Sequence, residues 1–290
     1  MKQRITRCVW GAMVFALTLS ACGGKNQKTA TTNFSTDSIM TNDTLNELRI
    51  DSVRLSWLKD NAGERLMPRT LFPDAPDSLI DSLGLQDGIP ASVSTFLVET
   101  NGCLILFDTG NGTPDSRLLP ELKRRGISPA DIRYLYLTHF HGDHIGGMMQ
   151  GDSVVFPNAE VYASQMEYDG WMNMPEERKA QVVKTMEAYK ERLHLFSFGD
   201  VLPGNVTALN AVGHTPGHTA FQVGRLLIVG DLMHGTALQL LRPDICATFD
   251  MDREAAAATR KRILQYAKEN GLTLAGMHFP TPGWIKGEGK

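Results

Sequence analysis

Three histidines and an aspartate crowded into one short stretch constrain this chain more than any other feature. Residues 138–147 contain His139, His141, Asp143 and His144. The chain has eight histidines in all, so three within six positions are not expected of a solvated surface loop. Imidazole and carboxylate groups at this density are typical of a metal site.

The residues before this stretch predict how its side chains are presented. Residues 132–137 are apolar or aromatic apart from Arg133, and they predict a buried strand that ends at the histidines. Side chains two apart in extended backbone point the same way, so His139 and His141 can hold one ion. A glycine turn and a helix beginning near Asp143 would direct Asp143 and His144 to a neighbouring position. The spacing therefore suggests two metal ions.

The pattern His-x-His-x-Asp-His followed by Gly-Gly resembles the signature of the metallo-β-lactamase-fold hydrolases. The resemblance covers about residues 47–286. It implies an α/β fold, the αββα sandwich in which two β-sheets are flanked by helices. It also implies a metal-dependent hydrolase in which a hydroxide bridging two zinc ions attacks the substrate.

A second histidine loop lies at residues 212–219. Pro216 and Gly217 stand between its two histidines and exclude an ordinary helix, so a loop must hold both rings. In the family that the motif resembles, the first histidine of this loop is a metal ligand and the second stands behind it. The resemblance therefore implies these roles for His214 and His218.

Two further apolar strands end at a residue that can bind a metal. One, at 226–230, ends at Asp231, and the other, at 272–277, ends at His278. The ordinary roles of such residues are a helix cap for the aspartate and a core position for the histidine. The resemblance instead makes Asp231 the acid that bridges both metals and His278 the last ligand.

The resemblance thus implies a complete set of ligands. The first zinc ion would be held by His139, His141 and His214, the second by Asp143, His144 and His278, and Asp231 would span both. Asp143 and Asp231 are the residues expected to take part in catalysis. Asp108, in an Asp-Thr-Gly after another buried strand, is implied as a support behind the metals, although it also suits a plain turn. A ligand set without cysteine favours zinc, with manganese, iron or cobalt as alternatives.

The segments after the bridging acid suggest a branch of the family. Residues 230–234, 237–239, 242–244 and 278–280 resemble the branch that contains acyl-homoserine lactonases and methyl parathion hydrolase-like enzymes. This resemblance implies a small-molecule lactone or ester as substrate. Phosphotriesterase or β-lactamase activity at the same site is the alternative. A single-iron persulfide dioxygenase and a binding lipoprotein without activity are the hypotheses from other classes.

Candidate pocket residues come from two stretches and from His234, which follows the bridging acid. Trp171 and Met172 lie in a glycine-flanked stretch that is expected to be a loop and to form an apolar wall, although such residues are more often core. Phe72 lies in the irregular segment 67–88. This segment is expected to cover the site, to meet a second subunit of a homodimer, or to be a plain connector.

The N-terminal residues predict export. Residues 1–21 have a basic start and an apolar run too short to span a bilayer, as in a signal peptide. The Leu-Ser-Ala-Cys sequence that ends at Cys22 resembles the lipobox of bacterial lipoproteins, the alternative being a simple cleaved signal. Cys22 would then be lipidated, and the protein would be a cell-envelope lipoprotein facing the periplasm or the exterior. Residues 22–46 are predicted to be a flexible tether, and residues 47–290 the hydrolase domain.

Composition limits the partners. A net charge of -3 gives no basic surface for a nucleic acid, so none is expected. The expected partners are the small-molecule substrate and, through the lipid anchor, a membrane. Cys103 and Cys246 are expected to be small buried thiols rather than a disulfide.

Overall fold

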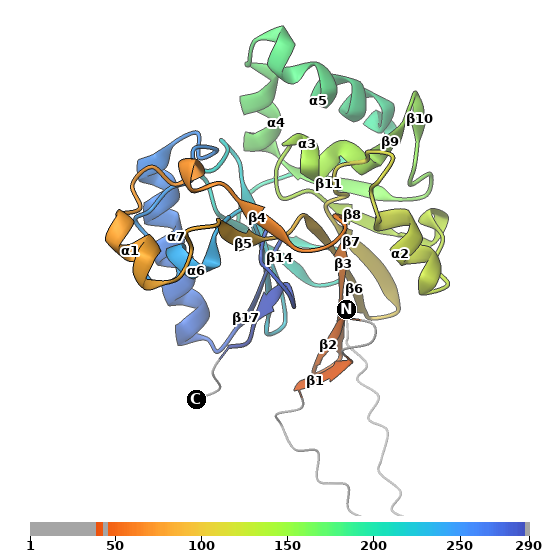
Figure 1. The fold of residues 1–290 in the computed structure, drawn as a ribbon. Helices are drawn as coiled ribbons and strands as arrows, with labels where there is room; N and C mark the ends of the chain where they lie inside the picture. Colours follow the sequence, from red (N-terminus) through yellow and green to blue (C-terminus); the bar gives the residue numbers. More distant parts are fainter. Residues whose placement is uncertain (1–38, 43–45, 288–290) are drawn as a thin grey trace, which may run out of the picture. The chain divides into compact units, whose positions relative to one another are not determined.

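The structure is a computed structural model that describes residues 39–42 and 46–287 (Figure 1). The predicted signal peptide, Cys22 and most of the predicted tether lie outside the described residues. Strand β1 (Ile39–Asn42) pairs antiparallel with β2 (Glu47–Ile50), so the sheet begins before the boundary predicted at residue 47. None of the helices in the described ranges has the length and hydropathy that crossing a bilayer requires.

Two large mixed sheets form the centre of the fold. The first has the order β1-β2-β3-β6-β7-β8-β11-β12, with β3 at Val53–Lys59, β6 at Ser94–Thr100, β7 at Cys103–Phe107, β8 at Tyr134–Tyr136, β11 at Glu160–Ser164 and β12 at Leu193–Phe196. The second has the order β13-β14-β15-β16-β17-β18, with strands at Val201–Leu202, Val206–Asn210, Thr219–Val223, Leu226–Gly230, Thr273–Gly276 and Trp284–Ile285. Two ribbons complete the strands: β4 (Arg65–Met67) with β5 (Ile89–Ala91), and β9 (Met149–Gln150) with β10 (Ser153–Val154).

Helices cover the outer faces of both sheets (Figure 1). The α-helices are α1 (Asp77–Ser82), α2 (Leu118–Arg124), α3 (Gly142–Ile145), α4 (Gln165–Met172), α5 (Glu176–Ala188), α6 (Thr236–Gln239) and α7 (Arg253–Glu269). Short 3-10 turns lie at Arg69–Leu71, Pro129–Asp131, Gly146–Met148 and Lys190–Arg192. Apolar residues of α2 and α5 pack on the first sheet, and those of α7 pack on the second. The αββα sandwich that the resemblance implied is therefore confirmed.

The core between the two sheets is rich in aromatic rings. Phe107 and Tyr136 from the first sheet each place their ring centroid 5.5 Å from that of Phe221 in the second. All three side chains are fully buried. Burial of one such ring stabilises the fold by about 1.5–3 kcal/mol, so these contacts fix how the sheets are stacked.

Tight turns join neighbouring strands at two places in the first sheet. Residues 94–107 form a hairpin, with positive φ at Asn101 and Gly102 in its two-residue turn. Residues 47–58 are divided between β2 and β3 by a tight turn in which Asp51 has φ 55°. Cys103 and Cys246 are both free, as expected, but only Cys246 is buried and Cys103 is partly exposed.

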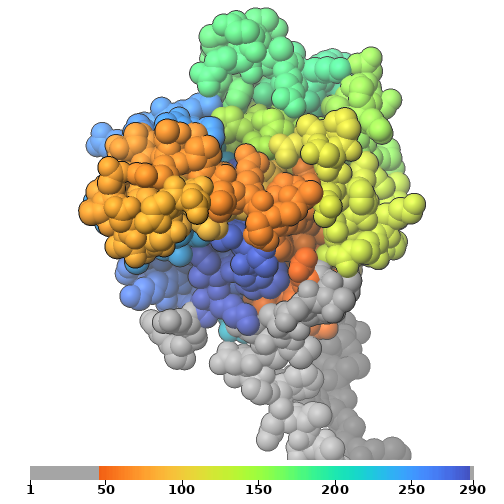
Figure 2. Space-filling view, in the orientation of Figure 1, coloured from red at the N-terminus to blue at the C-terminus, as the bar shows by residue number. Residues whose placement is uncertain are grey.

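The segment that was expected to be irregular packs against the second half of the chain. Its residues Phe72 and Ile80 are buried against Leu238 and Ile245. In the space-filling view this orange segment lies over part of the blue C-terminal region (Figure 2). Segment 67–88 therefore belongs to the hydrophobic core and also covers part of the C-terminal region.

Candidate metal centre

The candidate site forms where loops follow the ends of strands from both sheets. His139 follows β8, and Asp231 and His278 follow β16 and β17, which are parallel neighbours. Parallel strands place their carboxyl ends at the same edge, so Asp231 and His278 emerge side by side. His214 comes from the loop between β14 and β15. These loops bring together residues up to 139 positions apart in the sequence.

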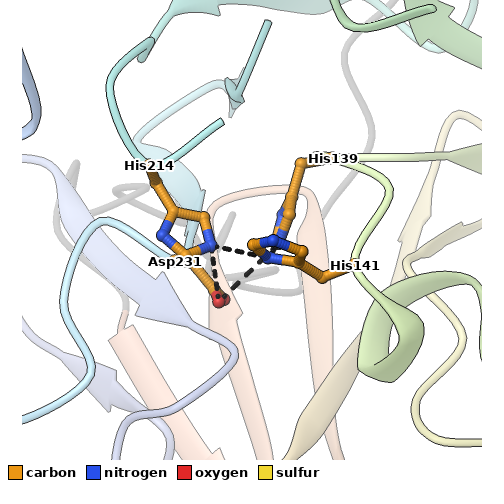
Figure 3. Close-up of side chains that lie close together, drawn as sticks. All are labelled: His139, His141, His214 and Asp231. Carbon is orange, nitrogen blue, oxygen red and sulfur yellow. Dashed lines mark hydrogen bonds and ion pairs between the residues drawn. The ribbon is translucent and has the colours of Figure 1, made fainter. Parts of the chain in front are cut away.

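Four of the predicted ligands form one tight group (Figure 3). His141 Nδ1 lies 3.0 Å from His139 Nε2 and 2.9 Å from His214 Nε2. Asp231 Oδ2 lies 3.3 Å from His214 Nε2 and 3.7 Å from His139 Nε2. The four side chains therefore point at a common centre.

The other three predicted ligands form a second group beside the first. His278 Nε2 lies 3.4 Å from Asp143 Oδ2, and His144 Nε2 lies 3.8 Å from Asp143 Oδ1. Asp231 connects the two groups, because its Oδ1 is 3.1 Å from His144 and its Oδ2 is 3.0 Å from His278. The structure thus brings together all the residues that the sequence proposed as ligands, with Asp231 between the two groups.

The outer nitrogen of each of three rings is held by an acceptor, which fixes the orientation of the ring. The Nδ1–H groups donate to Asp108 Oδ2 (His144, 2.7 Å), Asp250 Oδ1 (His214, 3.0 Å) and the Ser92 carbonyl (His278, 2.8 Å). The inner Nε2 atoms of these rings consequently face one another and Asp231. This arrangement is the usual one for histidines that bind a metal.

Two buried atoms at the centre fit a cation. His144 Nε2 and Asp231 Oδ1 are 3.1 Å apart but form no hydrogen bond, and neither has another hydrogen-bond partner among the described residues. Buried polar atoms are normally satisfied. A metal ion bound between these residues would satisfy both, so the residues present fit the metals that the resemblance implied.

The pKa values indicate that the buried carboxylates stabilise positive charge beside them. Burial favours neutral imidazole at His144 and His278, yet Asp231 raises the pKa of both rings, that of His144 well above its ordinary value. Burial lowers the pKa of His139 well below its ordinary value and that of His141 to about 3, so these rings are neutral. A divalent cation would displace the protons from His144 and His278.

Asp108 and His218, which the resemblance implied as supports of the site, are hydrogen-bonded to the proposed ligands or to their neighbours. Asp108 accepts from the Thr138 amide at 2.8 Å and the Thr138 hydroxyl at 2.7 Å, as well as from His144. His218 donates from Nδ1 to the Ala211 carbonyl at 2.9 Å, and its Nε2 accepts from the Asp231 amide at 3.1 Å. These bonds fix the backbone that carries the ligands.

The cavity above the ligands has a different lining from the one predicted. Its volume is about 270 Å³, and Arg65, Met67, His234 and Phe249 line it together with His141, Gly142, Asp143, His214, Asp231 and His278. Of the predicted pocket residues, only His234 lines it. His234 Nε2 also contacts Asp231 Oδ2 at 3.1 Å.

Of the other predicted pocket residues, Trp171 and Phe72 lie in the core and Met172 is partly buried against it. Trp171 and Met172 belong to helix α4 rather than to a loop. The Trp171 indole donates to Glu167 at 2.7 Å. The Trp171 and His141 rings pack nearly perpendicular to each other. Phe72 is 2% exposed and packs under the β4–β5 ribbon. The prediction that these three residues form the pocket wall is therefore wrong.

Sequence reasoning missed several residues around the site. Asp250 and Glu167 hold the ligand loops, and Arg65 and Phe249 lie at the mouth of the cavity. Asp250 and Glu167 reach the site from distant parts of the sequence, so no spacing pattern marks them. Ser164 and Glu167 do form a Ser-x-x-Glu pattern, which is a signal for the start of a helix and would have predicted α4.

Comparison with known proteins identifies the family. The sequence profile of the metallo-beta-lactamase superfamily matches residues 88–278, more than half of the chain. The chain belongs to this superfamily. The match spans all the proposed metal ligands.

Curated relatives include lactonases. An N-acyl homoserine lactonase from Bacillus sp is 30% identical over 153 residues, which are 44% of this chain and 56% of the relative. A ribonuclease Z from Pyrococcus abyssi is 38% identical over 65 residues, 22% of this chain and 20% of the relative. The chain thus spans about half the length of the first of these relatives and a fifth of the second.

Two solved structures are similar over most of their length. AidC, a dizinc quorum-quenching lactonase solved with the product N-hexnoyl-L-homoserine, has a TM-score of 0.74 and 27% identity, covering 84% of this chain and 93% of AidC. The hydrolase AbOPH also has a TM-score of 0.74, with 29% identity and coverage of 83% and 91%. The fold is therefore the one that the sequence indicated, and lactonases are among the proteins that this chain resembles.

Proposed function

We propose that this member of the superfamily is a metal-dependent hydrolase that opens lactone rings. The observation that carries the proposal is the convergence of five histidines and two aspartates on one buried centre. A structural metal site would more often be closed by thiolates, and none of these residues is a cysteine.

Two zinc ions fit the two groups of ligands. His139, His141 and His214 would hold one ion, Asp143, His144 and His278 the other, and Asp231 both. When bound, the ions would polarise a carbonyl and make a water molecule acidic enough to ionise near neutral pH. The dizinc content of AidC supports this assignment.

Asp143 differs from the other central carboxylate in its exposure. The side chain of Asp143 is 30% exposed and lines the cavity, whereas that of Asp231 is 3% exposed and surrounded by histidines. Asp143 is therefore placed to accept a proton from a reacting water or to return it to a leaving group. Asp231 instead holds the rings around it in position.

The mouth of the cavity supports a substrate with a polar head and an apolar tail. Met67 and Phe249 offer apolar contact, and Phe249 is 43% exposed. Arg65 beside them has no hydrogen bond or ion pair to any described side chain, so its guanidinium is available to a substrate oxygen. An acyl-homoserine lactone has a compact ring, an amide oxygen and an acyl chain, and it matches these features.

The test is a comparison of kcat/KM across substrate classes. The panel contains lactones with acyl chains of several lengths, a paraoxon-type phosphotriester, a cephalosporin and a phosphodiester. We expect lactones to give the highest values, and Asp143→Asn to lower all of them. Higher values for the cephalosporin or the phosphodiester would contradict the lactonase assignment while leaving the metal centre in place.

A further inference from the structure

Glu167 is a buried carboxylate that the proposed reaction does not use. It lies in the first turn of α4 and is 1% exposed. Burial raises the pKa of its carboxyl group, and four donors oppose this effect. A buried carboxylate is costly unless it is fully hydrogen-bonded, so its set of partners indicates its role.

Both oxygens of Glu167 are fully engaged. Oε1 accepts from the Phe140 amide at 3.0 Å and from the Trp171 indole at 2.7 Å. Oε2 accepts from the Thr215 hydroxyl at 2.8 Å and from the Gly217 amide at 2.7 Å. Three of these four donors belong to loops that carry proposed ligands.

The positions of these donors in the sequence connect one ligand group. Phe140 lies between His139 and His141, and Thr215 directly follows His214. One carboxylate therefore ties together the two loops that carry all three histidines of the first group. None of its hydrogen bonds reaches residues 143–144 or 278, which carry the second group.

Close packing of α4 on the second loop reinforces this connection. A Cβ atom at Gly217 would collide with the backbone of Glu167, and one at Gly170 would lie 2.6 Å from the Cβ of Pro216. The loop after His214 can therefore approach the helix only because glycines lie at both contacts. Helix α4 and the loop after His214 therefore form one packed unit. The Glu167 carboxylate connects this unit to the loop that carries His139 and His141.

We infer that Glu167 is a positioning residue that selectively sets the metal affinity of the site formed by His139, His141 and His214. This inference rests on the metal centre proposed above. Loss of the carboxylate leaves buried donors in both loops without a partner, so the loops must shift to satisfy them. Outer partners of metal ligands typically contribute 10–100-fold to metal affinity.

The experiment measures zinc affinity in proteins that keep one group of ligands. His278→Ala disrupts the second group, and His214→Ala disrupts the first. Competition with a chromophoric chelator then gives the zinc affinity of each background, with and without Glu167→Gln. We expect Glu167→Gln to weaken zinc binding about 10–100-fold in the His278→Ala background and to leave it nearly unchanged in the His214→Ala background.

Two further variants act as controls. Trp171→Phe removes the one donor that lies outside the ligand loops, and we expect nearly wild-type zinc affinity. Thr215→Val keeps the side-chain size and removes one donor from the His214 loop. Thr215→Val should also lower the zinc affinity of the first group of ligands. This variant tests the inference if Glu167→Gln does not fold.

Three outcomes would overturn the inference. Unchanged affinity in folded Glu167→Gln and Thr215→Val would show that the carboxylate does not position the ligands. Equal losses in both backgrounds would show a general structural role instead. A wild-type chain that binds no metal would overturn the proposed function, and the inference with it.

Discussion

Asp250 connects a proposed metal ligand to a buried guanidinium. Its Oδ1 accepts from His214 at 3.0 Å and its Oδ2 accepts from Arg260 at 3.1 Å, and both side chains of the ion pair are almost fully buried. Arg260 also donates to the carbonyls of Leu232 and Ile245. The pair therefore couples the ligand loop to helix α7.

Removing the charge of Asp250 should destabilise the fold. Asp250→Asn leaves the Arg260 charge buried without its counterion, and we expect a loss of about 3–5 kcal/mol in the free energy of unfolding. Urea denaturation of the wild type and the variant measures this difference in the free energy of unfolding. The control is Asp244→Asn, whose partner Arg242 is exposed, and which should cost less than about 1 kcal/mol. Equal losses in the two variants would contradict this account.

The same pair has a predictable pH dependence. Burial opposes the ionisation of Asp250, but the hydrogen bond from His214 and nearby positive charges lower its pKa to about 2. A lowered pKa gives stability that is complete above the unfolded value of about 3.9 and is lost as the pH falls toward 2. Asp250→Asn should therefore flatten the acid side of the stability profile.

At the scale of the elements, helix α4 explains the main error in the predicted site. Ser164 accepts from the Glu167 amide at 3.1 Å and caps the helix. A helix places residues four apart on one face, so Trp171 lies over Glu167 in the core instead of facing the cavity. Apolar composition alone cannot distinguish a pocket wall from a core face, which is why the sequence predicted the wrong wall.

The residues that line the mouth of the cavity predict how activity depends on the acyl chain of the substrate. Phe249→Ala removes an apolar ring at the cavity, and we expect kcat/KM to fall about fivefold to tenfold for long-chain lactones and less for short ones. The matched control is Leu66→Ala. Leu66 lies beside Met67 and is 51% exposed but does not line the cavity. An equal fall in kcat/KM for all acyl-chain lengths would contradict contact between Phe249 and the acyl chain.

At the scale of the whole molecule, the resemblance of the histidine motif to a known family indicated the proposed ligands, and two of these, Asp231 and His278, follow the ends of predicted strands. Apolar strands that end in Asp231 and His278 are visible in the sequence, and neighbouring parallel strands bring such ends together. The residues that hold the ligand loops in position were not predictable in the same way. Asp250 and Glu167 act through contacts that depend on how distant loops pack, and only the folded chain brings these contacts together.

Export and lipidation remain a proposal about the whole molecule. The lipobox-like sequence before Cys22 predicts that the protein fractionates with membranes and that Cys22→Ala abolishes lipid labelling. Several acyl chains on one residue suffice for stable attachment, whereas a single chain is marginal. Cys103→Ala is the control and should label like the wild type. Unchanged labelling of Cys22→Ala would reject Cys22 as the attachment site.

The metal content of the purified protein tests the central claim most directly. Elemental analysis should find about two transition-metal ions per chain, mainly zinc. Their removal by a chelator should lower Tm, because the buried carboxylates then lose their counterions. A reproducible single iron per chain, accompanied by oxygen uptake with persulfide substrates, would contradict the dizinc hydrolase.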